Sequence, residues 1–125
     1  MNLSLDTHVL LWWLDDSPAL RRDVRDAIAA SGNLLIVSAA VIWEIRIKQA
    51  LGKLEIDPTF LEIVRRQGFE LLSITADHAC AVGDLPLHHR DPFDRLIIAQ
   101  ARIEGLTIVT HDPQFARYDI PMLSF

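Results

Sequence analysis

The sequence has little of several features that mark particular protein classes. It contains one cysteine, Cys80, within the apolar stretch "HACAV", so no disulfide can form inside the chain, and we expect a buried thiol. No apolar run approaches the roughly 20 residues that a membrane-spanning helix needs. The opening "MNLSLD" lacks the basic residues that begin a secretory signal. These absences predict a cytoplasmic protein without a membrane segment.

Basic charge is also scarce. Twelve lysine and arginine residues stand against 17 aspartate and glutamate residues, and the formal net charge is −5. This balance argues against a protein that binds nucleic acid through bulk positive charge alone. It does not exclude an enzyme whose acidic site holds cations, because the formal charge omits bound metal.

Apolar runs alternate with helical patterns along all 125 residues, half of which are hydrophobic, and we expect one domain spanning residues 1–125. The expected strands are 2–5, 34–37, 69–74, 106–109 and, more weakly, 121–125. The expected helices are 7–14, 18–31, 38–52, 58–68, 75–85 and 91–105. Ser17 with Pro18, and Ser38, suit helix starts, while Gly52 and Gly105 suit helix ends. Most strands are continuously apolar, which predicts a parallel sheet covered on both faces and an α/β fold.

Acidic residues follow or adjoin several of these strands. Asp6 comes directly after the first strand, and Asp112 lies just beyond the fourth. Asp91 and Asp94 open the helix that leads into the fourth strand, and Glu44 lies inside the helix after the second. Ligands bind outside the carboxyl ends of the strands in open parallel sheets, so these acids are candidates for one common site.

Each acid also has a purely structural interpretation. Asp6, Asp91 and Asp112 suit helix N-caps worth about 1 kcal/mol each, and Asp91, with an acid three residues later, resembles a capping box. Glu44 could pair with Lys48 one turn later on a solvated helix face. Capping, however, gives no reason for the acids to gather at one end of one sheet.

Converging carboxylates need compensation. Two that approach to about 5 Å repel by roughly 3 kcal/mol at an effective dielectric constant of about 20. Protons or divalent cations must offset this repulsion, and hard carboxylate oxygens without cysteine favour Mg²⁺ or Mn²⁺ over zinc. The histidines near these motifs match no zinc spacing, so we expect no metal role for them. An acidic cluster with one or two such ions is typical of phosphodiester hydrolysis.

Four motifs in this order resemble the PIN-domain ribonucleases, and among them the VapC-type toxins of toxin–antitoxin pairs. They are "LDTHVLLWWL" (5–14), "SAAVIWEIRIKQALGKL" (38–54), "LPLHHRDPFDRLIIAQA" (85–101) and "IVTHD" (108–112), and together they cover essentially the whole chain. The resemblance implies a PIN-like three-layer α/β sandwich whose five-stranded, mostly parallel sheet has helices on both faces.

The resemblance also implies the site. The family's acidic positions correspond to Asp6, Glu44, Asp94 and Asp112. Asp6 and Asp94 would be the main ligands of one or two Mg²⁺ or Mn²⁺ ions, directly or through water, and the other two would complete the acidic ring. Thr110 would orient Asp112 or a metal-bound water, and Asp91 would play a supporting role.

The activity implied is that of a metal-dependent endoribonuclease acting as a toxin. Hydrolysis would leave a 5′-phosphate and a 3′-hydroxyl on the RNA. The toxin would form homodimers and be neutralised by a cognate antitoxin, with helices 38–52 and 58–68 forming a groove for an antitoxin segment. The basic residues expected to hold the RNA backbone are Arg95, Arg90, Arg46 and Lys48, although each could equally be an ordinary solvated charge.

Two other α/β families fit the residues less well. A phospho-acceptor signalling domain needs a lysine late in the chain, whereas Lys48 and Lys53 both precede the third strand. A haloacid-dehalogenase-like phosphatase needs an aspartate two residues after the first, where this chain has His8. The alternative that stays open is a non-catalytic PIN-fold module that only binds protein partners.

Overall fold

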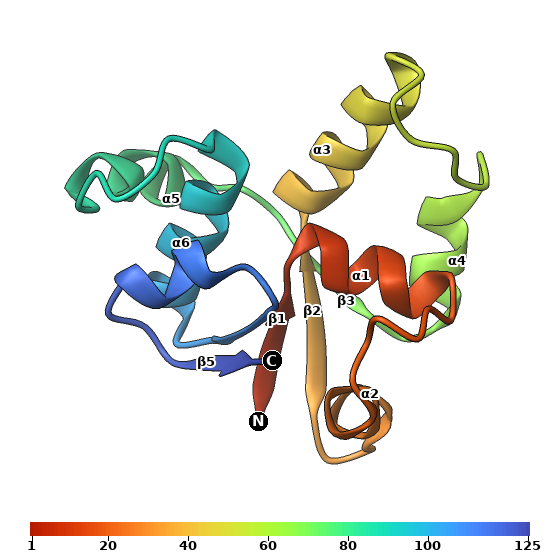
Figure 1. Cartoon of the computed structure of the whole chain (residues 1–125). Helices are drawn as coiled ribbons and strands as arrows, with labels where there is room; N and C mark the ends of the chain where they lie inside the picture. The colour runs from red at the N-terminus through yellow and green to blue at the C-terminus, as the bar shows by residue number, and fades with distance from the viewer.

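Five short strands lie side by side in one sheet at the centre of the protein (Figure 1). In this computed structural model, which describes all 125 residues, the strands follow the order β3-β2-β1-β4-β5 and all neighbours are parallel. Their bounds are β1 Asn2–Leu5, β2 Leu34–Ser38, β3 Glu70–Leu72, β4 Thr107–Thr110 and β5 Met122–Ser124. In the central strand, Leu3 pairs with Leu35 on one side and with Thr107 on the other. The predicted five-stranded sheet is confirmed.

Helices cover both faces of this sheet. They are α1 Thr7–Leu14, α2 Arg22–Ala29, α3 Ala39–Ala50, α4 Phe60–Arg66, α5 Ala76–Ala81 and α6 Pro92–Glu104, with 3₁₀ turns η1 Val82–Asp84 and η2 Pro113–Arg117. Helices α5 and α6 lie on one side, and α1, α2 and α4 lie on the other (Figure 1). Helix α3 rises from the carboxyl end of β2 and contacts both α1 and α6. The predicted three-layer sandwich is therefore confirmed.

The boundaries of α6 and α3 follow from their capping residues. Asp91 caps α6 by accepting hydrogen bonds from the backbone N–H groups of Phe93 and Asp94, and Pro92 occupies the first turn. Gly105 ends the helix in the left-handed conformation, with φ of 68°. The hydroxyl of Ser38 caps α3 by accepting from the N–H of Ala40.

The predicted start of α2 at Ser17 and Pro18 is wrong. Ser17 accepts from the N–H of Ala19 through its side chain and from the N–H of Leu20 through its carbonyl, so the chain turns here and the helix begins at Arg22. Helix α4 also starts later than expected, because the side chain of Asp57 bonds the backbone N–H and hydroxyl of Thr59 in a turn before Phe60.

A single cluster of 26 buried hydrophobic residues fills the space between the sheet and its helices. The predicted burial of Cys80 is wrong: its side chain is exposed. Helix α5 is short and buries only His78, and a residue two positions later points to the opposite side of a helix. No helix combines the length and the apolar character needed to cross a membrane.

We predict that Gly105→Ala lowers the free energy of unfolding by about 1–2 kcal/mol, because an L-residue is strained in the left-handed region. A Cβ at this position would meet no atom within 4 Å, so the cost is that of the backbone alone. Gly83→Ala is the matched control, since its Cβ also meets nothing and its φ is not positive. Urea unfolding would measure both, and equal effects would contradict the conformational explanation.

Candidate active site

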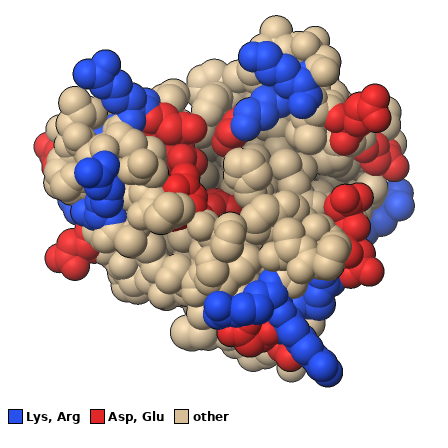
Figure 2. Space-filling model, viewed as in Figure 1, with Lys and Arg blue, Asp and Glu red and all other residues tan.

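Five carboxyl groups from separate parts of the chain meet at the carboxyl edge of the sheet. They line a small polar hollow of about 100 Å³ whose walls are Asp6, Thr7, His8, Glu44, Lys48, Asp91, Asp94, Asp112 and Phe115. Acidic side chains gather around a central depression in the surface view (Figure 2). The structure thus brings together all of the acids singled out from the sequence.

Asp6 lies at the junction of β1 and α1 and is almost completely buried. Its Oδ1 accepts from the N–H of Val9 at 2.9 Å, and its Oδ2 accepts from the hydroxyl of Thr110 at 2.5 Å. Burial raises the pKa of Asp6, the two hydrogen bonds and nearby His8 oppose that rise, and the charge of Asp112 adds to it. Asp6 is therefore a buried acid held in place at both oxygens.

Thr110 at the end of β4 joins the acids of two neighbouring strands. Its hydroxyl donates to Asp6 and accepts from the backbone N–H of Asp112 at 3.0 Å. The sequence suggested that Thr110 orients Asp112 or a bound water. The structure places its donated hydrogen bond on Asp6 instead, and it meets Asp112 only through the main chain.

Glu44 reaches the hollow from α3 and is buried, with 6% of its surface exposed. Its Oε1 accepts from the hydroxyl of Thr7 at 2.7 Å, and its Oε2 pairs with Nζ of Lys48 at 2.7 Å. The Glu44–Lys48 pair considered from the sequence does form, but not on a solvated face. Thr7 was missed by the sequence analysis, although its position directly after Asp6 is a signal that could have indicated it.

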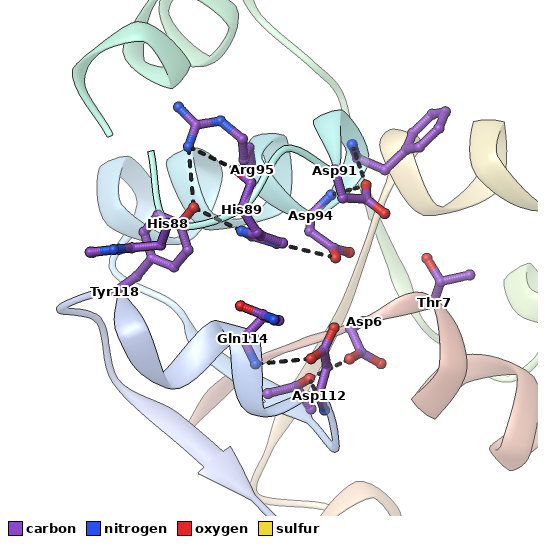
Figure 3. Close-up of polar contacts among 12 residues, drawn as sticks. Asp6, Thr7, His88, His89, Asp91, Asp94, Arg95, Asp112, Gln114 and Tyr118 are labelled. Carbon is purple, nitrogen blue, oxygen red and sulfur yellow. Dashed lines mark hydrogen bonds and ion pairs between the residues drawn. The ribbon is translucent and has the colours of Figure 1, made fainter. Parts of the chain in front are cut away.

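Asp94, in the first turn of α6, lies where the negative charges converge (Figure 3). Burial raises its pKa to about 8, with further contributions from the charges of Asp91, Glu44, Asp6 and Asp112. A proton therefore stays on this carboxyl at neutral pH when no cation is present. A group tuned in this way within a cleft is a strong functional candidate.

The structural interpretation of three acids is confirmed as well. Asp6, Asp91 and Asp112 cap α1, α6 and η2, and each does so through Oδ1 alone. Capping and chemistry are compatible, because a helix N-terminus stabilises negative charge. Asp91 and Asp112 thus keep Oδ2 for other contacts in the hollow.

Of the four basic residues expected to hold RNA, only one lines the acidic hollow. Lys48 lines the hollow, whereas Arg90 is exposed at the surface, and Arg46 is also exposed and bonds to Gln49 on its own helix. Arg95 was the leading candidate for a phosphate contact, but it turns away from the hollow (Figure 3). Its guanidinium donates to main-chain carbonyls of the loop before α6, belonging to Val82, Leu85 and Pro86, and to the hydroxyl of Tyr118. This loop could not be placed from sequence periodicity.

The donor set of the hollow suits a hard divalent cation. It is dominated by carboxylate oxygens with hydroxyls behind them, with one histidine, His8, and no cysteine. No group of three histidine, cysteine or carboxylate side chains is arranged to hold a metal ion directly. Mg²⁺ usually keeps several waters and binds one or two carboxylates, so it fits this arrangement better than zinc does.

Comparisons with known proteins bear on the family and the fold. Residues 3–121 match the PIN domain family. A comparison with curated protein sequences gave no match. Among solved structures, the chain is similar to VapBC2 from Rickettsia felis bound to a DNA fragment from its promoter, with a TM-score of 0.76, 17% identity, and coverage of 100% of this chain and 99% of the other.

Two further structures share the fold. A toxin–antitoxin complex from Klebsiella pneumoniae matches with a TM-score of 0.66 and 20% identity, over 97% of this chain and 95% of the other. The PIN domain endonuclease Utp24 matches with a TM-score of 0.60 and 19% identity, over 99% and 84%. At these identities the likeness establishes the shared fold.

The raised pKa of Asp94 predicts a pH-dependent stability in the absence of divalent cations. The unfolded chain releases this proton near the ordinary pKa of 3.8, whereas the folded protein keeps it until about pH 8. The stability that it contributes is therefore complete at low pH and is lost as the pH rises toward 8. Replacing Asp94 by asparagine removes this dependence.

We expect the melting temperature of Asp94→Asn to exceed that of the wild type in EDTA. The difference in the free energy of unfolding between the two proteins should widen between about pH 4 and pH 8, by at most about 1.4 kcal/mol per pH unit, and then level off. Asp77→Asn, an exposed acid in the first turn of α5, is the control and should show no such trend. A gap that is independent of pH would mean that Asp94 ionises normally.

Proposed function

The chain belongs to the PIN domain family, and on that premise we propose that it is a metal-dependent endoribonuclease, the toxin of a toxin–antitoxin pair. The observation that carries the proposal is the meeting of five carboxyl groups at one hollow, where burial and mutual charge raise the pKa of Asp94 to about 8. A fold under no functional demand would not concentrate this much uncompensated negative charge. The substrate is RNA, and the protein acts in the cytoplasm, where RNA is available.

In this proposal one or two Mg²⁺ or Mn²⁺ ions compensate the charge. Asp6 and Asp94 hold the metal, directly or through water, and Asp112 and Glu44 complete the ring. When bound there, the metal supplies an activated water and stabilises the leaving oxygen of the RNA. Asp94 would hold such a cation as the ionised carboxylate, because a cation favours that form.

The chain's own residues hold this arrangement rigid. Thr110 fixes one oxygen of Asp6, and Thr7 fixes one oxygen of Glu44. The caps at Asp91 and Asp112 fix the Oδ1 atoms of those acids, and both residues line the hollow. Orientation of this kind lowers the cost of assembling the reacting groups.

Basic side chains of α3 would hold the RNA backbone. Lys48 lines the acidic hollow, whereas Arg46 is exposed on the same helix and lines a separate hollow with Trp43 and Leu61. Arg90 would add a third phosphate contact just before α6. Contacts of this kind position a nucleic acid without reading its sequence. Arg95 is left out of this set because its donors are already engaged.

Two apolar hollows beside α4 support the proposed antitoxin partner, and one of them, of about 370 Å³, lies between α3 and α4 and is lined by Ile42, Leu61 and Leu71. The other hollow, of about 540 Å³ between α1 and α4, is lined mainly by apolar residues, among them Leu11, Leu54, Ile56, Phe60 and Ile63. Such a groove suits an apolar segment of an antitoxin. The toxin–antitoxin complex from Klebsiella pneumoniae has the same fold.

We propose a homodimer through α3. Trp43, Ile47 and Leu51 are exposed and spaced four residues apart, so they form one apolar stripe along the helix. Exposed apolar stripes commonly mark protein interfaces.

Two variants test the nuclease assignment. Asp94→Asn and Asp6→Asn should each lower Mg²⁺-dependent cleavage of a mixed RNA substrate at least about 100-fold, because each removes a carboxylate that holds the metal. Asp77→Asn should cleave at the wild-type rate, and EDTA should stop every protein. Near-ultraviolet circular dichroism would verify that each variant is folded.

Two results would contradict the nuclease assignment. If the wild type, freed of any bound antitoxin, cleaves none of a broad panel of RNAs in Mg²⁺ or Mn²⁺, the chain is a non-catalytic PIN-fold binding module. Cleavage that persists in EDTA, or in Asp94→Asn, would overturn the assigned site and leave the activity to be explained elsewhere.

A charge placed in the apolar stripe of α3 tests the proposed dimer. Ile47→Glu places a charge in the apolar stripe of α3 and should convert a dimer into a monomer in light scattering coupled to size exclusion. Ile103→Glu is the control, because Ile103 is also exposed but lies on α6 outside the stripe. A monomeric wild type, or a dimer that tolerates Ile47→Glu, would contradict this interface.

A further inference from the structure

A chain of polar contacts leads from Arg95 through Tyr118 and His89 to Asp94. Arg95 donates from Nη1 to the hydroxyl of Tyr118 at 3.1 Å, and that hydroxyl lies 2.8 Å from Nδ1 of His89. The other ring nitrogen of His89, Nε2, lies 3.4 Å from Oδ2 of Asp94. Figure 3 shows the four side chains in this order, with Asp94 at the end that faces the acidic hollow.

The direction of this chain is fixed by Arg95. A guanidinium only donates, so the oxygen of Tyr118 accepts from Arg95, and Nδ1 of His89 is the one acceptor within hydrogen-bond distance of the Tyr118 O–H. Nδ1 of the neutral imidazole is then the acceptor, and the ring proton is placed on Nε2. His89 accordingly presents an N–H to Oδ2 of Asp94.

Burial restricts the side chain of His89 to this contact with Asp94. Its side chain is 12% exposed, and Tyr118 is buried. Nε2 of His89 is shielded from solvent and has no hydrogen-bond partner within normal distance, so Asp94 is its one available acceptor. Hydrogen bonds also fix the segment that carries His89. Arg117 donates to the carbonyl of His88, and Arg95 donates to the carbonyls of Val82 and Leu85.

We infer that His89 is a positioning residue that holds Asp94 by Oδ2 and leaves Oδ1 for the cation, with Tyr118 and Arg95 selecting the required tautomer. This inference rests on the proposed function, since it assigns the support of one of its metal-holding carboxylates. The arrangement follows the general pattern in which a ligand is oriented by a hydrogen-bonded partner behind it.

The inference also explains why Arg95 faces away from the hollow. A cation that touched the acids directly would compete with the metal for their charge. Acting through Tyr118 and His89, Arg95 orients Asp94 without neutralising it. Tyr118, the only tyrosine of the chain, had no role in the sequence analysis.

Two substitutions at one position separate orientation from packing. Glutamine at position 89 places an amide N–H near the position of Nε2, whereas asparagine reaches only as far as Nδ1. We expect His89→Asn to weaken Mn²⁺ binding in isothermal titration about 10-fold or more, and His89→Gln to stay within about threefold of the wild type. His88→Asn, on the neighbouring exposed histidine, should leave the Mn²⁺ affinity unchanged. Equal Mn²⁺ affinities for the asparagine and glutamine variants would overturn the inference.

A second measurement reads the tautomer of His89 directly, without a substitution at position 89. The ¹⁵N shifts of histidine-labelled wild type should show His89 as the Nε2–H tautomer, and Tyr118→Phe should reduce that preference and weaken Mn²⁺ binding. A proton on Nδ1 in the wild type would overturn the inference. Wild type that binds no Mn²⁺ and cleaves no RNA would remove the proposed function itself, whereas Mn²⁺-dependent cleavage with an unaffected His89→Asn would remove only the role of His89.

Discussion

Negative charge concentrated at the carboxyl edge of a parallel sheet is the constraint on which this site depends. Parallel strands end at the same edge, so acids placed after β1 and β4 and at the start of α6 must meet there. Burial penalises the ionised form of these acids and strengthens their repulsion. Both effects raise the pKa of Asp94. Every polar neighbour of the hollow either fixes one of these acids or offsets its charge.

The protein meets this constraint with parts that also stabilise its fold. Asp6, Asp91 and Asp112 each start a helix or turn with one oxygen, so the same residue contributes to stability and to the site. Thr7 and Thr110 satisfy buried carboxylate oxygens without adding positive charge, and only Lys48 forms an ion pair in the hollow. The net charge therefore stays negative, as a cation-binding site requires.

The sequence was sufficient for the strands, the three layers and the list of acids, because these follow from apolar periodicity and from the position of acids after strands. It was not sufficient for contacts made by irregular segments. Arg95 was expected at the phosphate backbone, yet the loop before α6 surrounds its guanidinium with carbonyls. Cys80 was expected inside because its neighbours are apolar, but α5 is too short to bury more than His78. Thr7 donates a hydrogen bond to Glu44, which lies 37 residues later in the sequence, and local sequence patterns do not predict contacts over such a separation.

The most direct test of the central claim is a crystal of the protein soaked in Mn²⁺ and measured at the manganese absorption edge. An anomalous peak in the hollow, within coordination or water-bridged distance of Asp6 and Asp94, is the predicted result. A hollow that stays empty at millimolar Mn²⁺ in well-ordered crystals, or manganese bound only elsewhere on the surface, would contradict the claim that these acids are gathered to hold a divalent cation.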